Sequence, residues 1–535
     1  MGDPATHPVA ASSGSAPSFD RLTPEQHRIL AYASALGSEF EFPLLVAAMH
    51  GDEETLAEQV ERLTHLGIFR ERPGGDRFGF VEEEFRAQIY RSLTESRLRV
   101  LHRKIAEVLE QRHPDPSRPI LAELGRHYFL GKVPQKSAHF NRRAAEAARA
   151  GDEPNVAAQH LQRVLLDLAA LGGDRQREIA AAAEELGEIY YSTGNFAAAD
   201  RAFGEALDRI GRDDPRIRAR LLLARAEVAR ENLDGDHAVQ GAVDARRLFE
   251  IAGDRLGIAQ TYRLLGRVAF QRGAYRDALD ESIRAFDLLG PDRDPMLVGR
   301  LSIDIGNSFA LLGSEVRPIA IEWYERAVER LRQTGDWAEL ARAYHNLGAA
   351  VGETAPQDGL DYLERAQEAA ERAHDARSAG RALLSGVAMR LALGQLEEGE
   401  RDNEQAGRIL GRLSDDFGIE QVEINRGQIF ERRAQWEEAE RSYERASEMC
   451  RKFQLPADRA EVSFYLARLR FKTRNFAGAH AAMDVALRLG LPELRPHLAT
   501  ACTQLERQIH DALLENPAAP KVLDGSPATT EQRPV

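Results

Sequence analysis

Polar side chains that can make directional hydrogen bonds recur close to small residues in the second half of this 535-residue chain. An asparagine or glutamine amide carries both a donor and an acceptor, so it can pair with a peptide unit whatever side chains that peptide bears. Each bond contributes about 0.5–1.5 kcal/mol, whereas a micromolar site needs about −8 kcal/mol, so several amides would have to act beside apolar pockets. The polar residues near the small ones include Arg263, Arg267, Asn307, His345, Asn346, Asn425, Gln428 and Arg468, and phenylalanines in the same stretches are Phe270, Phe464 and Phe471.

Residue patterns typical of catalysis or of cofactor binding do not occur in the sequence. It has no HExxH motif, no GxSxG motif and no cysteine pair at metal-ligand spacing. Its one Gly-Lys pair, Gly131-Lys132, follows Arg126 where a phosphate-binding loop needs a glycine. Cys450 precedes Arg451 and Lys452, which could lower its pKa, but a small buried residue is the simpler interpretation. We therefore expect a protein that is not an enzyme and that holds no cofactor or metal.

The small residues beside the polar side chains belong to a unit of about forty residues. In one unit, Gly266 is followed after 12 residues by Ala278 and after 7 more by Ala285. Small side chains at these points let two antiparallel helices approach closely, so that stacked hairpins bury a continuous core. The pattern predicts an all-α solenoid of eight units, which are anchored by Gly187, Ala226, Gly266, Gly306, Gly348, Gly386, Gly427 and Ala467.

The N-terminal region departs from this helical pattern at one place. Alternating residues over 68–81 predict two short strands around a turn, and capping and stop signals predict three helices before them. Three helices followed by a β-hairpin form a winged-helix arrangement. The expected organisation begins with a disordered arm (1–20), a winged-helix domain (21–95) and a helical connector (96–175), which includes one degenerate helix pair at 119–171. Eight repeats (176–490), a capping helix (491–514) and a disordered tail (515–535) follow.

The spacing of 12 and then 7 residues resembles the tetratricopeptide repeat in its longer, roughly forty-residue version. HEAT and armadillo arrays share the longer period but not this spacing. In tetratricopeptide stacks the first helix of each unit lines the concave face. The resemblance therefore implies that the polar residues named above face inward and are the candidate binding residues, with the three phenylalanines as candidate pocket residues. Ile305-Gly306-Asn307 and His345-Asn346-Leu347-Gly348 also resemble repeats in which asparagines bind the backbone of an extended peptide.

Segment 22–112 is similar to the region after the nucleotide-binding domain in bacterial signal-transduction ATPases of the MalT and large LuxR type. The residues that carry this resemblance include Leu36-Gly37-Ser38-Glu39-Phe40, Phe78-Gly79-Phe80 and Ile89-Tyr90-Arg91-Ser92-Leu93. In that family a winged helix leads directly into tetratricopeptide repeats. The chain has no room for an ATPase module before this segment, and Glu82 replaces the histidine that the family tends to carry, so the resemblance implies an ATPase or kinase as a separate partner.

The charge of the chain bears on its partners. A formal net charge of −14 argues against general affinity for nucleic acid or anionic membranes. Residues 21–95 hold eight arginines and no lysine against 14 acidic residues, and the helix that would enter a DNA groove begins Glu53-Glu54, so nucleic acid is disfavoured as a partner. No apolar stretch approaches the length of a membrane span, and two cysteines without a signal peptide indicate a cytoplasmic protein.

Together these features favour a non-enzymatic scaffold or signalling adaptor that holds a peptide or protein segment in the concave face of its repeats. A small effector is a second possible ligand of that face. The alternatives are a ligand-responsive transcriptional regulator and a regulatory subunit of an ATPase or kinase complex.

Overall fold

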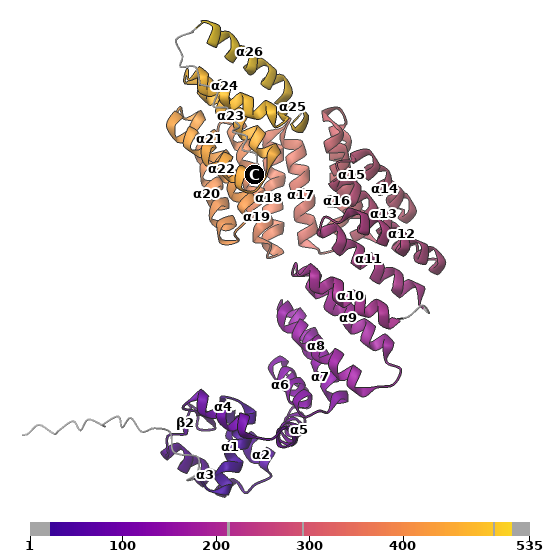
Figure 1. Ribbon diagram of the computed structural model, residues 1–535, viewed down its shortest axis with the longest axis vertical. Helices are drawn as coiled ribbons and strands as arrows, with labels where there is room; N and C mark the ends of the chain where they lie inside the picture. Colours follow the sequence, from indigo (N-terminus) through magenta and orange to yellow (C-terminus); the bar gives the residue numbers. More distant parts are fainter. Residues whose placement is uncertain (1–21, 211–213, 291–293, 496–497, 516–535) are drawn as a thin grey trace, which may run out of the picture. The chain divides into compact units, whose positions relative to one another are not determined.

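The computed structural model describes residues 22–210, 214–290, 294–495 and 498–515, and these residues are almost wholly helical (Figure 1). The chain divides into two compact units, Met1–Ile258 and Ala259–Val535, which we describe separately. Among the described residues, no helix combines the length and the apolar character that crossing a membrane requires. The predicted arms at 1–20 and 515–535 lie outside the described residues, apart from Glu515, which ends the last helix.

The first unit begins with the three helices and the hairpin that the sequence predicts. The helices are α1 (Pro24–Leu36), α2 (Phe42–Met49) and α3 (Glu53–His65), and the hairpin strands are β2 (Phe69–Glu71) and β3 (Arg77–Phe80). Thr23 and Gln26 form a reciprocal capping box at the start of α1, and Asp52 caps α3. A third strand, β1 (Glu39–Glu41), was not predicted. It pairs antiparallel with β3, giving the sheet order β1-β3-β2. The assignment as a winged helix stays a prediction.

A buried chain of hydrogen bonds joins this module to the helices that follow it, α4 (Glu83–Ser92), α5 (Glu95–Arg112) and α6 (Arg118–Leu130). The Tyr90 hydroxyl lies 2.8 Å from Nε2 of His102, and Nδ1 of His102 lies 2.9 Å from Nδ1 of His127. Arg126 donates to Nε2 of His127 at 3.0 Å and to the Leu36 carbonyl at 3.3 Å. We call Tyr90, His102, His127 and Arg126 the histidine chain.

The direction of the bonds in the histidine chain follows from Arg126, because its guanidinium can only donate. Nε2 of His127 must therefore accept, so a neutral His127 carries its hydrogen on Nδ1 and donates it to His102. His102 in turn carries its hydrogen on Nε2 and donates to Tyr90. Burial, with Arg126 nearby, lowers the pKa of His102 to about 4 and the pKa of His127 well below its usual value, so both rings are neutral near pH 7.

The connector differs from the single degenerate pair that was predicted at 119–171. Three helices occupy that region: α6, α7 (Pro134–Ala150) and α8 (Pro154–Leu171). Asn141 of α7 is fully buried, donates to the Gly125 carbonyl at 3.0 Å and bonds His160 of α8 at 2.8 Å. A polar side chain thus joins all three helices, and hydrophobic periodicity carries no signal for such a junction.

Eight helical hairpins follow in the part of the chain that the structure describes, and they confirm the predicted all-α solenoid architecture. In the first unit these are α9 (Gln176–Ser192) with α10 (Phe196–Ile210), and α11 (Pro215–Glu231) with α12 (Gly235–Ala252). α13 (Arg255–Gln271) crosses the boundary between the units. Its part in the second unit packs against α14 (Tyr275–Leu289), where Gly266 lies against Ala278 and Ser282. The remaining hairpins are α15 (Pro295–Leu312) with α16 (Arg317–Leu331), α17 (Trp337–Gly352) with α18 (Pro356–Arg372), α19 (Ala376–Ala392) with α20 (Leu396–Arg412), α21 (Asp416–Arg432) with α22 (Trp436–Lys452), and α23 (Pro456–Lys472) with α24 (Phe476–Arg488).

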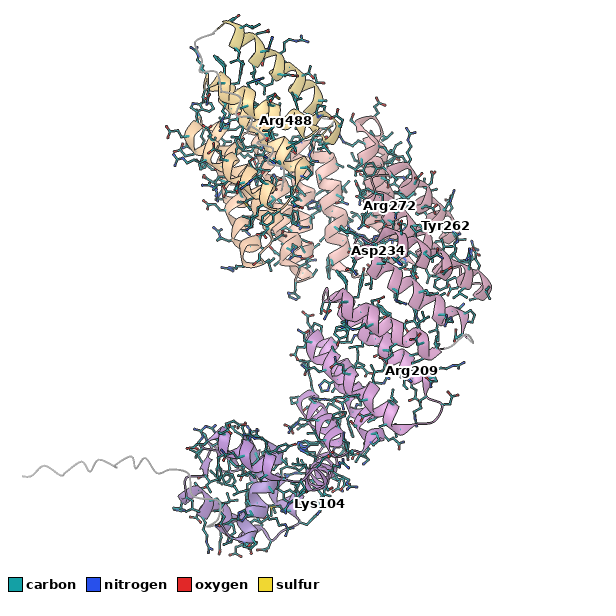
Figure 2. All side chains as sticks on the ribbon, viewed as in Figure 1. Lys104, Arg209, Asp234, Tyr262, Arg272 and Arg488 are labelled. Carbon is teal, nitrogen blue, oxygen red and sulfur yellow. The ribbon has the colours of Figure 1, made fainter. Side chains whose placement is uncertain are left out.

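The small anchor residues are needed because an aromatic ring of the second helix often lies directly on them. A Cβ atom added at Gly187 would lie 2.5 Å from the Phe203 ring, and one added at Gly427 would lie 2.5 Å from the Tyr443 ring. Contacts this short do not occur between carbon atoms, so only glycine permits this helix spacing. Figure 2 shows the side chains of the described residues on these helices.

The turn inside several hairpins requires a left-handed backbone. Gly194 and Gly273 adopt φ angles of 75° and 77°, which cost a glycine nothing. Leu233, Ala434 and Arg474 adopt the same region, with φ between 57° and 61°, although a side chain makes it unfavourable there.

The C-terminal end of the second unit is formed by two helices where one was predicted over 491–514. α25 (Leu491–Leu494) is a single turn, and α26 (Ala499–Glu515) follows it. Cys502, Leu505 and Ile509 of α26 are buried in the cluster that also contains the last hairpin. The final helix therefore covers the apolar end of the stack, as the predicted cap would.

Candidate functional site

The candidate binding residues all lie on the first helices of hairpins in the second unit. We call the surface formed by α13, α15, α17, α19, α21 and α23 the first-helix face. α15, α17, α19 and α21 contact one another in order, in addition to packing against the second helix of each hairpin. Side chains at equivalent positions of neighbouring units therefore come within bonding distance, although they are about forty residues apart in sequence.

At the α13 end of this face, the candidate residues bond one another or a neighbouring helix. Nε of Arg263 donates to Oδ2 of Asp304 at 2.7 Å, and both side chains are largely buried. Arg267 is half-buried one turn further along α13. Nδ2 of Asn346 donates to Oδ1 of Asn307 at 2.8 Å, and the Tyr324 hydroxyl donates to the same oxygen at 2.8 Å.

The bond between the two asparagines determines which of their polar atoms remain available. Within the described residues, no hydrogen bond engages Nδ2 of Asn307 or Oδ1 of Asn346, and neither atom belongs to the buried polar atoms that lack a partner. The pair therefore presents one open donor and one open acceptor on neighbouring helices. A peptide unit offers the complementary acceptor and donor.

His345 and Asn425 both contact the neighbouring first helix α19. Nε2 of His345 lies 3.4 Å from the Ser385 hydroxyl, and burial together with Arg381 lowers the pKa of His345, which favours the neutral ring. Asn425 is only 2% exposed. Its Nδ2 donates to the Leu384 carbonyl at 3.3 Å and its Oδ1 accepts from Gln421 at 3.0 Å. Asn425 thus joins α21 to α19 and is not open to a ligand.

The apolar pockets expected beside these residues are not formed by the three candidate phenylalanines. Phe464 is 3% exposed. Phe270 and Phe471 lie against Tyr275 and Phe476, with ring centres 5.3 and 5.6 Å apart, each within its own hairpin. These rings support the hairpin turns.

An open recess of about 410 Å³ lies at the C-terminal end of the first-helix face. Gln428 and Arg468, two of the candidate residues, line it from α21 and α23. We call it the basic recess, and its full lining among the described residues is Gln428, Glu431, Arg432, Tyr465, Arg468, Lys472 and Leu498. Three cationic side chains therefore face one carboxylate, although the chain as a whole is acidic.

That carboxylate, Glu431, is 7% exposed and accepts three hydrogen bonds. They come from Arg468 at 2.9 Å, from Lys472 at 2.7 Å and from the Tyr443 hydroxyl at 3.0 Å. Burial opposes the charge of Glu431, but the bonds from Arg468 and Lys472 hold its pKa below the usual value. Glu431 therefore stays ionised and fixes both cations at the wall of the recess.

Sequence reasoning missed Arg432, Lys472, Glu431 and Tyr465, although a signal for two of them was present. Gln428 and Arg468 are 40 residues apart, and so are Arg432 and Lys472. Each pair occupies equivalent positions of consecutive units, and the members of one helix are four residues apart on one face. Extending the search by one turn beyond the anchor would have found the two cations.

The structure gives no chemical environment for catalysis at the cysteine considered above. Cys450 is fully buried, and its thiol donates to Oε1 of Glu420 at 3.1 Å. Burial raises the pKa of the Cys450 thiol, and Glu420 raises it further, so the thiolate form is disfavoured. Within the described ranges, no group of three or more histidine, cysteine, aspartate or glutamate residues could hold a metal ion.

No protein-family model matches the sequence, and no curated protein matches it either. Among solved structures, the chain is similar to a signal transduction ATPase with numerous domains (STAND) that has a tetratricopeptide repeat sensor, from Pyrococcus horikoshii, with 15% identity and a TM-score of 0.45 over 80% of this chain. It spans 63% of the length of that protein. It is also similar to a Rap protein complexed with competence and sporulation factor (13% identity, TM-score 0.43, 68% of this chain and 95% of that one). A third similar structure is the Rap conjugation gene regulator of the plasmid pLS20 in complex with the Phr* peptide (14% identity, TM-score 0.42, 73% of this chain and 96% of that one).

Proposed function

We propose that this protein is a non-enzymatic interaction scaffold, and that the first-helix face of its second unit binds an extended peptide or protein segment. The observation that carries the proposal is the Asn307–Asn346 pair. Its one open donor and one open acceptor match a peptide unit, and the two asparagines lie on consecutive first helices.

The neighbouring contacts support this role by fixing the pair in place. The Tyr324 hydroxyl holds Oδ1 of Asn307, and Arg263 is held by Asp304 on the same helix as Asn307. Side chains that are already ordered lose less conformational freedom when a ligand binds, so each hydrogen bond contributes more to affinity.

The test uses a variant that replaces the open donor by an oxygen of the same size and adds one negative charge. In Asn307→Asp the side chain keeps the oxygen that accepts from Tyr324 and Asn346 but loses the open Nδ2 donor. Peptides are selected from a random library on the intact chain, and their affinities for wild type and variant are measured by calorimetry. We expect the variant to bind at least about fivefold to tenfold more weakly, because one hydrogen bond is lost and the new carboxylate oxygen faces the peptide carbonyl that Nδ2 would have bound.

Arg441→Ala serves as the matched control, because Arg441 is exposed on the second helix α22. Selected peptides that bind all three proteins equally, or that lose affinity only for Arg441→Ala, would place binding away from the first-helix face and refute the proposal. Asn425 is unsuitable as a test of binding, because its replacement removes a buried bond between α19 and α21.

A further inference from the structure

The basic recess has hydrogen-bond donors that the protein itself does not use. Nη1 of Arg468 has no hydrogen-bond partner among the described residues and is not one of the buried unpartnered atoms, and the Arg468 side chain is 35% exposed. Lys472 donates to Glu431, but its ammonium group carries three hydrogens and its side chain is 49% exposed. Arg432 is exposed at the rim, where one of its nitrogens donates to the Leu391 carbonyl. Gln428 adds a neutral amide to the same wall.

The charge of the lining is also incomplete. Glu431 compensates one of the three cations, so the recess has two positive charges in excess. Glu461 accepts a hydrogen bond from the Tyr465 hydroxyl at 2.6 Å and shares Arg495 with Asp458, so this neighbouring group has one net negative charge. The lining keeps a positive excess after this neighbour is counted, so the open side of the recess is a place where an anion would be stabilised.

The geometry of the cations favours a compact anion with several acceptors. The Arg468 guanidinium lies 5.0 Å from the centre of the Tyr465 ring, which orients its plane. Arg432 and Lys472 occupy equivalent positions of α21 and α23 and are 40 residues apart, so they approach from two neighbouring helices. A carboxylate offers one charge to this arrangement, whereas a phosphoryl group offers about −1.5 to −2 and three acceptor oxygens.

We propose that the basic recess binds a phosphoryl group. The group would be part of the segment held on the first-helix face or of a free phosphorylated compound, and in the first case the inference rests on the proposed function. Arg432, Arg468 and Lys472 would donate to its oxygens, with Gln428 as the neutral donor. Glu431 would keep Arg468 and Lys472 in place without contacting the ligand.

The experiment is calorimetric titration of the full chain with inorganic phosphate, with O-phosphoserine and with succinate, at low and at high salt. Phosphate and O-phosphoserine should bind, and added salt should weaken both, because the attraction is electrostatic. Lys472→Gln and Arg432→Gln should each weaken phosphate binding about tenfold, since each removes a charge-assisted hydrogen bond. Arg441→Gln makes the same change of charge on α22 and should leave the affinity unchanged.

Two outcomes overturn the proposal. One is that phosphate does not bind to wild type while circular dichroism shows every protein folded. The other is that succinate binds as tightly as phosphate, which would assign the recess to anions in general. If the bound segment carries the phosphoryl group, phosphorylating a library-selected peptide should tighten its binding about tenfold. If free phosphate binds but phosphorylation does not tighten peptide binding, the phosphoryl group belongs to a small compound.

This test is independent of the proposed function. Asn307→Asp should weaken the unmodified peptide and leave binding of inorganic phosphate unchanged. A chain that binds peptides but no phosphate would refute only the inference about the basic recess. A chain that binds phosphate but no peptide would refute only the scaffold.

Discussion

The histidine chain makes the attachment of the N-terminal module to the repeats dependent on pH. In the folded protein the pKa of His102 is lowered to about 4, against 6.5 for an exposed histidine, because the ring is buried and lies near Arg126. The unfolded chain therefore binds a proton that the folded chain excludes over this window. The free energy of unfolding is highest above about pH 6.5 and falls as the pH drops toward 4.

The size of the effect follows from the shift. Lowering the pKa of His102 from 6.5 to about 4 corresponds to about 3 kcal/mol of unfolding free energy, which is lost when His102 is protonated. Most of this loss has occurred by about pH 4.5. The pKa of His127 is lowered in the same direction, so its protonation adds to the loss. A proton added to His102 goes to Nδ1, so two N–H groups then face each other and the bond between the two Nδ1 atoms breaks. A proton added to His127 goes to Nε2 and breaks the bond from Arg126.

Hydrogen exchange measured peptide by peptide is a suitable assay, because it separates the junction from the rest of the molecule. After correction for intrinsic rates, amides of α4, α5 and α6 should lose about two orders of magnitude of protection between about pH 7 and about pH 4.5. The hairpin α15–α16 contains no histidine and serves as the internal reference. In His102→Gln the dependence on pH should be shallower. Equal protection of α4–α6 at both pH values would refute the reasoning.

Three further predictions concern the second unit, which contains all three tryptophans, so each is checked by urea unfolding followed by tryptophan fluorescence. Gly427→Ala should lower the free energy of unfolding by about 1–3 kcal/mol, because the new Cβ would overlap the Tyr443 ring. Gly411→Ala, on the open side of α20, is the control and should raise the free energy of unfolding by about 0.5–1 kcal/mol, because alanine favours a helix more than glycine does. Ala434→Gly should raise it by about 0.5–1 kcal/mol by relieving a left-handed alanine, and a decrease would mean that this turn carries no strain. Asn425→Ala should lower it by about 1–3 kcal/mol and leave phosphate binding unchanged, and an unaltered midpoint would show that the bond between α19 and α21 contributes little.

The architecture could be predicted from the sequence because its determinants are local. Spacing between small residues fixes how closely two helices approach, and this spacing is visible along the chain at Gly187 and Gly427. β1 escaped prediction because three residues, Glu39–Glu41, have no periodicity of their own and become a strand only by pairing with β3, about 40 residues later. The three-helix connector escaped prediction because its junction depends on the buried amide of Asn141.

The candidate site could be predicted only in part, because position on a helix face does not determine exposure. Asn346 and Asn425 both lie two residues before their anchor glycines, yet Asn346 is half-exposed and Asn425 is buried. The difference in exposure comes from the hydrogen-bond acceptor that the preceding unit provides. Asn307 presents a side-chain oxygen to Asn346, whereas α19 offers Asn425 only the Leu384 carbonyl, so the second side chain has to turn inward. Such partners are known only once the units are stacked.

The bonds along the first-helix face also determine how the array could lengthen or shorten during evolution. They join Arg263 to Asp304, Asn307 to Asn346 and Asn425 to the Leu384 carbonyl, which are 41, 39 and 41 residues apart. Duplication or deletion of one complete hairpin would leave each side chain opposite an equivalent neighbour. A change of a few residues inside a first helix would rotate all later side chains on that helix away from their partners. The length of this array should therefore vary among relatives in whole hairpins, while small insertions should be confined to its turns.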